Sequence, residues 1–136
     1  MTFEQIAAVL AAMSLGAMVF FSAIVAPTTF RALGEEHAGK FLRALFPNYF
    51  EVNGVVAIAA GALALQPIAS TLLVVAGAAM IAVKYLLIPK INDARDRWVA
   101  GSAAAKAEFD RDHRISVVIN VIEMALLVIA IVLLLQ

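Results

Sequence analysis

The sequence predicts an all-α, polytopic membrane protein: a four-transmembrane-helix, up-and-down bundle formed by a single domain over residues 1–136. Hydrophobic residues make up 64% of the chain and its mean hydropathy is +0.97. Soluble domains usually hold about 45–50% apolar residues, so a water-soluble fold of this length could not bury so much apolar surface. In addition, four apolar stretches each approach the ~20 residues that a helix needs to cross the bilayer.

These stretches cover residues 3–26, 47–65, 68–88 and 115–135. Helix is the only secondary structure expected for them, because an isolated strand leaves its backbone groups without partners in lipid. None of the stretches alternates apolar and polar residues as barrel strands do. Each is therefore expected to cross the membrane once.

Prolines mark the expected helix boundaries. We expect Pro27 to end the first helix, Pro47 to occupy the first turn of the second, and Pro89 to close the third. The dipeptide Gln66-Pro67 separates the second and third stretches. It predicts a tight hairpin between them.

Basic residues predict the orientation. Two longer connections, residues 28–46 and 90–114, hold nine of the ten Lys and Arg residues. Since basic loops stay in the cytoplasm, we expect both connections there and both termini in the periplasm of a bacterial inner membrane. Each connection is also expected to form an amphipathic helix on the membrane surface, with these residues embedded: Phe30, Phe41, Leu42 and Leu45 in the first, and Ile91, Ala94 and Trp98 in the second.

Composition excludes several classes of function. The net charge of zero argues against a nucleic-acid partner, and the absence of cysteine removes thiolate catalysis, disulfides and iron–sulfur sites. No glycine-rich phosphate loop or nucleophile elbow is present. The two histidines, His37 and His113, belong to no metal-ligand motif. The sequence thus predicts no catalytic residue and no metal site, and it identifies no cofactor.

Ionisable groups at bilayer depth are expensive, and Glu123 is the clearest one. It lies about twelve residues, or ~18 Å, from the end of the last helix. His113, Ser116, Asn120 and Glu123 are expected to share one face of that helix, which runs from the cytoplasmic surface to the centre of the membrane. This polar stripe either bonds neighbouring helices or forms a path for protons or cations, or a wall of a ligand cavity.

Lys84 and Glu51 are expected at similar depths, ~24 Å and ~21 Å from the outer ends of their helices. We expect an ion pair of Lys84 with Glu51 or with Glu123. Alternatively Lys84 reaches the surface and Glu51 sits in a first helical turn. If all three charges share the interior, one surplus negative charge remains, and one carboxylate must be protonated, bind a cation or contact water.

Small residues predict close helix contacts at Ala8-Ala12-Gly16 and at Ala57-Gly61. The two halves of the chain also follow a similar order: an apolar helix with a proline, a charged segment, and a returning helix that holds Asn53 or Asn120. This order indicates a duplicated helical hairpin.

Several short motifs resemble one known family. They are Met18-Val19-Phe20-Phe21-Ser22 with Ala26-Pro27 and Phe30-Arg31, then Phe46-Pro47-Asn48-Tyr49-Phe50, Tyr85-Leu86-Leu87-Ile88-Pro89, Asn92-Asp93-Ala94-Arg95-Asp96, and Phe109-Asp110 with His113-Arg114-Ile115-Ser116 and Asn120. Together they resemble a four-helix membrane family of unknown function that includes bacterial proteins similar to transmembrane protein 205. The resemblance implies a four-helix membrane protein without an assigned reaction, and it directs attention to a cytoplasmic-side cluster of Arg31, Tyr49, Asn92 and Arg95.

Three functions remain open at this level. The first is transport or permeation of a small solute, proton or cation through the polar cluster, more easily between the subunits of a homo-oligomer than within one copy. The second is a non-catalytic membrane scaffold that docks another protein. The third, ranked last, is a membrane oxidoreductase that binds haem or a metal through His37 and His113 near Lys84.

Overall fold

The computed structural model describes all 136 residues, and the chain is helical almost throughout, with no strand. The all-α prediction is confirmed. In chain order the elements are α1 (Phe3–Phe20), the π-helical turn η1 (Phe21–Val25), α2 (Ala26–Leu63), α3 (Pro67–Ala82), the π-helical turn η2 (Val83–Leu87), α4 (Ile88–Val99) and α5 (Ala103–Leu134).

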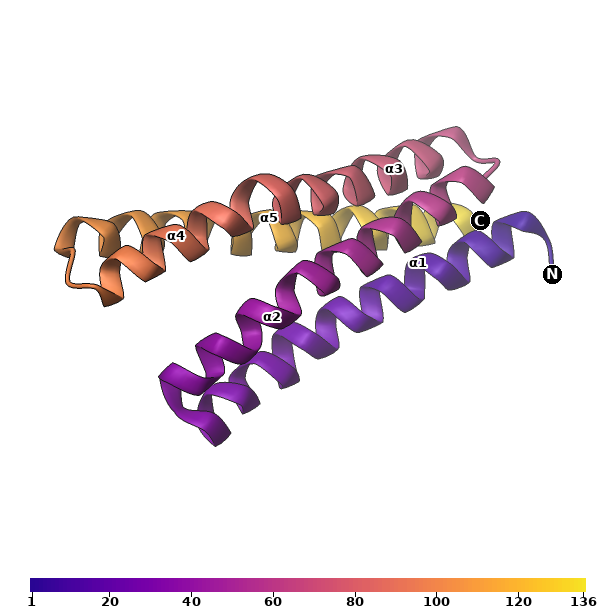
Figure 1. Cartoon of the computed structure of the whole chain (residues 1–136). Helices are drawn as coiled ribbons and strands as arrows, with labels where there is room; N and C mark the ends of the chain where they lie inside the picture. The colour runs from indigo at the N-terminus through magenta and orange to yellow at the C-terminus, as the bar shows by residue number, and fades with distance from the viewer.

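The chain reverses direction at two glycines with positive φ. Gly34 (φ 70°) lies within the span of α2, so the first residues of α2 continue α1 and the rest returns beside it (Figure 1). Gly101 (φ 106°) makes the turn from α4 to α5. Only glycine adopts such φ values without steric cost. We call the end of the bundle that holds both glycines the basic end.

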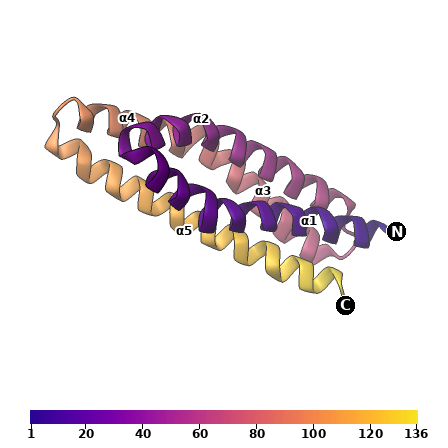
Figure 2. The same ribbon diagram turned by 90° about the horizontal axis from the view of Figure 1, so that it is seen from below.

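The opposite end holds both termini and the turn from α2 to α3 (Figures 1 and 2). There one carboxylate oxygen of Glu4 accepts hydrogen bonds from the backbone N–H groups of Leu65 (3.0 Å) and Gln66 (2.8 Å). The predicted tight hairpin at Gln66-Pro67 is confirmed. Glu4 ties the start of α1 to this turn, a role that nothing in the sequence indicated.

The expectation that Pro27 and Pro89 end helices is wrong. Each follows a π-helical turn by two residues, η1 or η2. Proline lacks an N–H and pushes against the carbonyl four residues earlier. The wider turn absorbs this, since the N–H of Ala26 bonds the carbonyl of Phe21, five residues back, and Ile88 bonds Val83 in the same way. Both helices therefore run on past their prolines, and Pro47 likewise lies inside α2 and not in its first turn.

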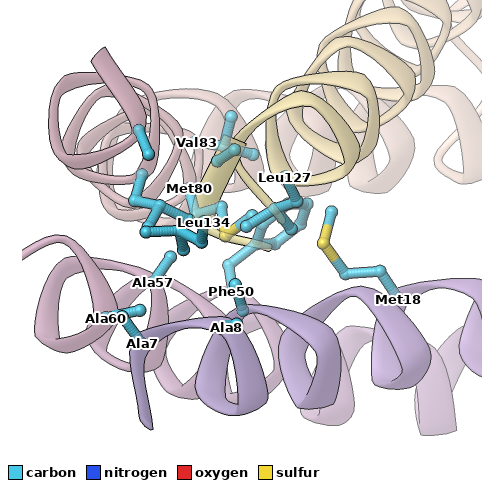
Figure 3. Packing of buried hydrophobic residues seen from close by; sticks show 14 of the residues in the cluster. Ala7, Ala8, Met18, Phe50, Ala57, Ala60, Met80, Val83, Leu127 and Leu134 are labelled. Atoms are coloured by element: carbon cyan, nitrogen blue, oxygen red, sulfur yellow. The ribbon is translucent and has the colours of Figure 1, made fainter. Parts of the chain in front are cut away.

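The helices pack as a ring in which α1 contacts α2, α2 contacts α3, α3 contacts α5, and α5 contacts α1. The core lies between them and includes Met18, Phe50, Met80 and Leu127, one from each of these helices (Figure 3). Many remaining core positions are alanines. The small side chains let the helices approach one another closely.

The closest approach is between α2 and α3. A Cβ added at Gly77 would lie 2.6 Å from the carbonyl oxygen of Gly54, and one at Gly61 would lie 2.7 Å from Val74. The small-residue contact expected at Ala57-Gly61 is therefore confirmed. The one expected at Ala8-Ala12-Gly16 forms only at Ala8, which is buried; Ala12 and Gly16 face outward, with open space beside Gly16.

Neither connection forms a helix separate from its neighbours. α4 continues the direction of α3 and packs against the start of α5, with Ile91 and Ala94 buried and Trp98 5.5 Å from Phe109 (Figure 1). The side expected to face lipid is thus the inside of a helical hairpin. In the first connection Leu42 is buried and Leu45 half-buried, whereas Phe30 and Phe41 are exposed.

Burial supports the expected duplication. Five buried positions of α1 and η1 recur in α3 and η2, and the same interval separates every pair: Ala7 and Ala69, Ala11 and Leu73, Ser14 and Ala76, Met18 and Met80, Phe21 and Val83. Asn53 follows Gly34 by the same number of residues as Asn120 follows Gly101. The molecule is therefore arranged as two similar helical hairpins.

The outer surface is apolar. Three helical segments, Phe3–Leu63, Pro67–Val99 and Ala103–Leu134, are long and apolar enough to cross a membrane, and most of each apolar window is not buried within the protein. Exposed side chains such as Val52, Val75 and Ile122 lie along them. Soluble proteins rarely expose continuous apolar surfaces of this extent.

Candidate functional site

Glu123 lies in the interior of the bundle. Its side chain is 1% exposed, and neither carboxylate oxygen has a hydrogen-bond partner. One turn further along α5, Leu127 is fully buried in the apolar core. A buried polar group normally has a partner, because each missing hydrogen bond costs about 1–3 kcal/mol. Glu123 is therefore the most unusual side chain of the molecule.

A short polar chain lies one helical turn from Glu123, toward the basic end. Asn120 precedes Glu123 by three residues, on the same face of α5. Its side-chain oxygen accepts a 2.9 Å hydrogen bond from the hydroxyl of Tyr49, and its amide nitrogen lies 3.5 Å from the hydroxyl of Ser22. These hydrogen bonds join α2, α5 and η1.

An aromatic cluster positions the hydroxyl of Tyr49. Its ring lies 4.6 Å from that of Phe21 and 5.0 Å from that of Phe50, and Phe46 packs at 6.3 Å. Such edge-to-face and offset contacts hold a ring in one orientation. The Phe-Pro-x-Tyr-Phe motif thus fixes the direction in which the Tyr49 hydroxyl points.

A second polar pair lies deeper in the bundle. The buried hydroxyl of Ser14 donates a 3.0 Å hydrogen bond to the side-chain oxygen of Asn53, whose amide donates at 2.8 Å to the carbonyl of Tyr49. Ser14 was not singled out from the sequence. One hydroxyl in an alanine-rich helix shows no pattern that distinguishes it from a surface serine.

The polar stripe of α5 changes character along its length. His113 is exposed and stacks on Phe109 at 5.7 Å, and Ser116 donates to the carbonyl of His113 at 2.8 Å. Only Asn120 and Glu123 contribute to the interior. The first half of the stripe is a surface feature.

Lys84 and Glu51 form an ion pair at 2.6 Å, so one of the two expected pairings is confirmed and the Lys84–Glu123 pairing is not formed. The Lys84 side chain is 16% exposed and that of Glu51 46%. The three charges therefore do not share the interior. The pair neutralises itself at the side of the bundle, and Glu123 stays alone.

A polar groove of about 480 Å³ runs beside this pair, between α2 and the η2–α4 segment. It is lined by Arg43, Pro47, Lys84, Ile88, Pro89, Asn92, Asp93 and Asp96. Arg43 donates two hydrogen bonds to Asp96, at 2.6 and 2.9 Å. These bonds hold the pKa of Asp96 below its usual value and raise the pKa of Arg43.

The four residues of the expected cytoplasmic-side cluster lie apart, and no hydrogen bond joins any two of them. Arg31 is exposed and bonds only Thr28, at 3.4 Å, Tyr49 lies inside the bundle, and Asn92 lines the groove. Arg95 lies against Gly39, where an added Cβ would overlap the guanidinium group, and donates at 3.4 Å to the carbonyl of Glu35.

His37 is exposed and makes no side-chain hydrogen bond. The structure contains no group of three or more His, Asp or Glu side chains placed to hold a metal ion.

The fold and the apolar outer surface define a class: an all-α protein whose long apolar helices indicate a membrane-spanning protein. Comparison with protein families is more specific. The model of a domain of unknown function, DUF4149, matches residues 9–98, and the chain belongs to this family. This agrees with the expected family of unknown function, while the resemblance to transmembrane protein 205 is not shown. No curated protein and no solved structure matches the chain.

Proposed function

We propose that the protein is a four-pass inner-membrane protein that transports a proton, a small cation or a small solute through the polar interior of its bundle. The observation that carries this proposal is the Glu123 carboxyl, which is almost completely buried and has no partner. An ionisable group at membrane depth without a structural partner is most simply explained by a ligand or a proton that it binds.

The membrane topology is supported by the positions of the chain reversals. The reversal within α2 and the α4–α5 turn lie at one end, and the α2–α3 turn and both termini lie at the other (Figure 1). Nine of the ten basic residues lie in the two connections that reverse at Gly34 and Gly101. The positive-inside rule then puts the basic end in the cytoplasm and Met1 and Gln136 in the periplasm.

Topology is tested with a reporter that fluoresces only in the cytoplasm, fused at Gln136 or inserted after Gly101. The proposal predicts signal from the insertion at Gly101 and none from the fusion at Gln136. Signal from the fusion at Gln136 would contradict the proposed orientation.

Transport is tested with purified protein in liposomes. Proton and potassium fluxes down imposed gradients are measured for the wild type, for Glu123→Gln, and for Glu35→Gln as a control at an exposed carboxylate. We expect flux in the wild type and in the control, and at least a tenfold loss in Glu123→Gln. Equal flux in all three would remove Glu123 from the transport path.

A non-catalytic scaffold is the second candidate, and a specific observation favours it. In the interior, Tyr49 is hydrogen-bonded to Asn120 and Ser14 to Asn53, as expected of polar side chains that only hold helices together. On this alternative, none of the liposome preparations conducts, and partner proteins co-purify with the chain from native membranes.

A further inference from the structure

We infer that the ligand of the interior site is the proton itself: Glu123 is a neutral carboxylic acid that exchanges its proton with the basic end of the bundle, on the side where Asn120 and Tyr49 lie. This inference rests on the proposed transport function and names its substrate. It also assigns the two ends of the bundle different roles, one open to proton exchange and one closed.

No positive charge is available to Glu123. Lys84 is the only basic residue among α1, α3, η1 and η2, and it is bound to Glu51 at 2.6 Å. Arg43 of α2 is held by two hydrogen bonds to Asp96. An ionised Glu123 would therefore be an isolated charge in an apolar core, which costs far more than a neutral acid.

The other titratable groups of the packed helices do not change this. On α1 the only one is Glu4, at the opposite end of the helix from η1, and α3 has none. On the membrane half of α2 they are Tyr49 and Glu51, and on η2 Tyr85 is exposed. Of these, only the Tyr49 hydroxyl is bonded to the residue one turn from Glu123.

A metal cation would lack ligands at this site. Hard cations take about six or more oxygen ligands. The side-chain oxygen of Asn120 accepts from Tyr49 and that of Asn53 accepts from Ser14, so both are engaged in protein hydrogen bonds. Glu123 belongs to no group of three or more acidic or histidine side chains able to hold a metal. The proton needs no coordination shell.

Along α5, the polar groups next to Glu123 lie on one side only. Toward the basic end Asn120, Tyr49 and Ser22 provide amide and hydroxyl groups that both donate and accept hydrogen bonds. Toward the termini the same face of α5 continues with Leu127, Ala130 and Leu134, all buried and apolar. In this conformation the proton therefore exchanges with the basic end.

The test uses a hydrophobic carbodiimide, to which a protonated carboxyl in apolar surroundings transfers its proton and then adds through its oxygen. The full-length protein in lipid vesicles is treated across a pH series, with and without sodium or potassium, and the adducts are located by peptide mass analysis. We expect one main adduct, at Glu123, whose rate of formation falls as the pH rises and is insensitive to either cation. Glu123→Gln should form none, and Glu123→Asp, which keeps the carboxyl if the bundle is folded, should be labelled.

The outcomes separate the inference from the transport proposal. Labelling of Glu123 without proton flux in liposomes would overturn the transport proposal and leave the proton site standing. Labelling suppressed by sodium or potassium would mean that a metal cation occupies the site, and would overturn the inference. Absence of labelling at Glu123 while the monodisperse protein is labelled at other carboxyls would overturn it as well.

Discussion

The hydroxyl of Tyr49 donates a 2.9 Å hydrogen bond to the side-chain oxygen of Asn120, across 71 positions of sequence. It joins the returning helices of the two hairpins one turn from Glu123. Because the bond lies inside the bundle, its removal affects both the packing of these helices and the surroundings of the carboxyl.

Tyr49→Phe is expected to lower the stability of the protein by about 1 kcal/mol, the usual scale for a hydrogen bond between membrane helices. The melting temperature in detergent should fall by roughly 4 °C. Tyr85→Phe is the matched control, because Tyr85 is exposed and lies outside the interior of the bundle. Equal melting temperatures of the two variants would mean that the bond contributes nothing.

Gly77→Ala tests the close approach of α2 and α3. The added Cβ would lie 2.6 Å from the backbone oxygen of Gly54, so the helices must move apart, at a cost of about 1–3 kcal/mol. Gly16→Ala adds the same group to α1 where nothing lies within 4 Å, and it should be neutral or slightly stabilising. Thermal unfolding of both variants checks the contrast, and a destabilised Gly16→Ala with an unaffected Gly77→Ala would reverse it.

Charge exchange tests the Lys84–Glu51 pair. Lys84→Glu alone puts two acids together and should destabilise the protein by about 1 kcal/mol, a modest value because the Glu51 side chain is half-exposed. Adding Glu51→Lys should restore most of the loss. The same exchange at the exposed Lys106–Asp110 pair serves as the control. A double variant at 84 and 51 that is no more stable than Lys84→Glu would show that the pair is not formed.

Acidification should lower the stability of the basic end of the bundle. Hydrogen bonds from Arg43 and Arg97 lower the pKa of Asp96 and Glu108, respectively, from usual values of 3.8 and 4.5. The folded protein therefore binds protons less readily at these two groups than the unfolded chain does. Their contribution to the stability of the folded protein is complete above the usual pKa values and is lost as the pH falls below them. The single tryptophan, Trp98, packs on Phe109 in this hairpin, and its fluorescence during heating reports the change.

Asp96→Asn and Glu108→Gln provide the comparison for this pH dependence. Each variant should be less stable than the wild type near neutral pH and should lose less stability on acidification. If the wild-type transition temperature stayed constant or rose as the pH fell below the usual pKa values of these acids, the assignment of the Arg43–Asp96 and Arg97–Glu108 pairs would be contradicted.

The sequence was sufficient to predict the helical class and the apolar segments, because hydropathy depends on composition and segment length alone. It did not predict where helices continue, since the effect of Pro27 or Pro89 depends on the preceding turn. A proline ends a helix only if the carbonyl four residues earlier cannot move aside, and η1 and η2 supply that movement. No residue type marks a π-helical turn in advance.

The candidate site was predicted in part for a similar reason. Glu123 stood out because a charge in an apolar run is visible in sequence, and helical spacing placed Asn120 beside it. The partners of these residues come from other helices. Which of Glu51 and Glu123 pairs with Lys84, and that Ser14 contacts Asn53, depends on how the helices are rotated in the bundle, which apolar composition does not fix.

The central claim is that Glu123 is a neutral acid inside the bundle, and infrared spectroscopy of the protein in lipid tests it most directly. The account predicts that the wild-type spectrum at neutral pH contains a protonated-carboxyl C=O band that Glu123→Gln lacks and Glu35→Gln keeps. A neutral-pH spectrum in which Glu123→Gln removes only a carboxylate band would show that the group is ionised and would contradict the account.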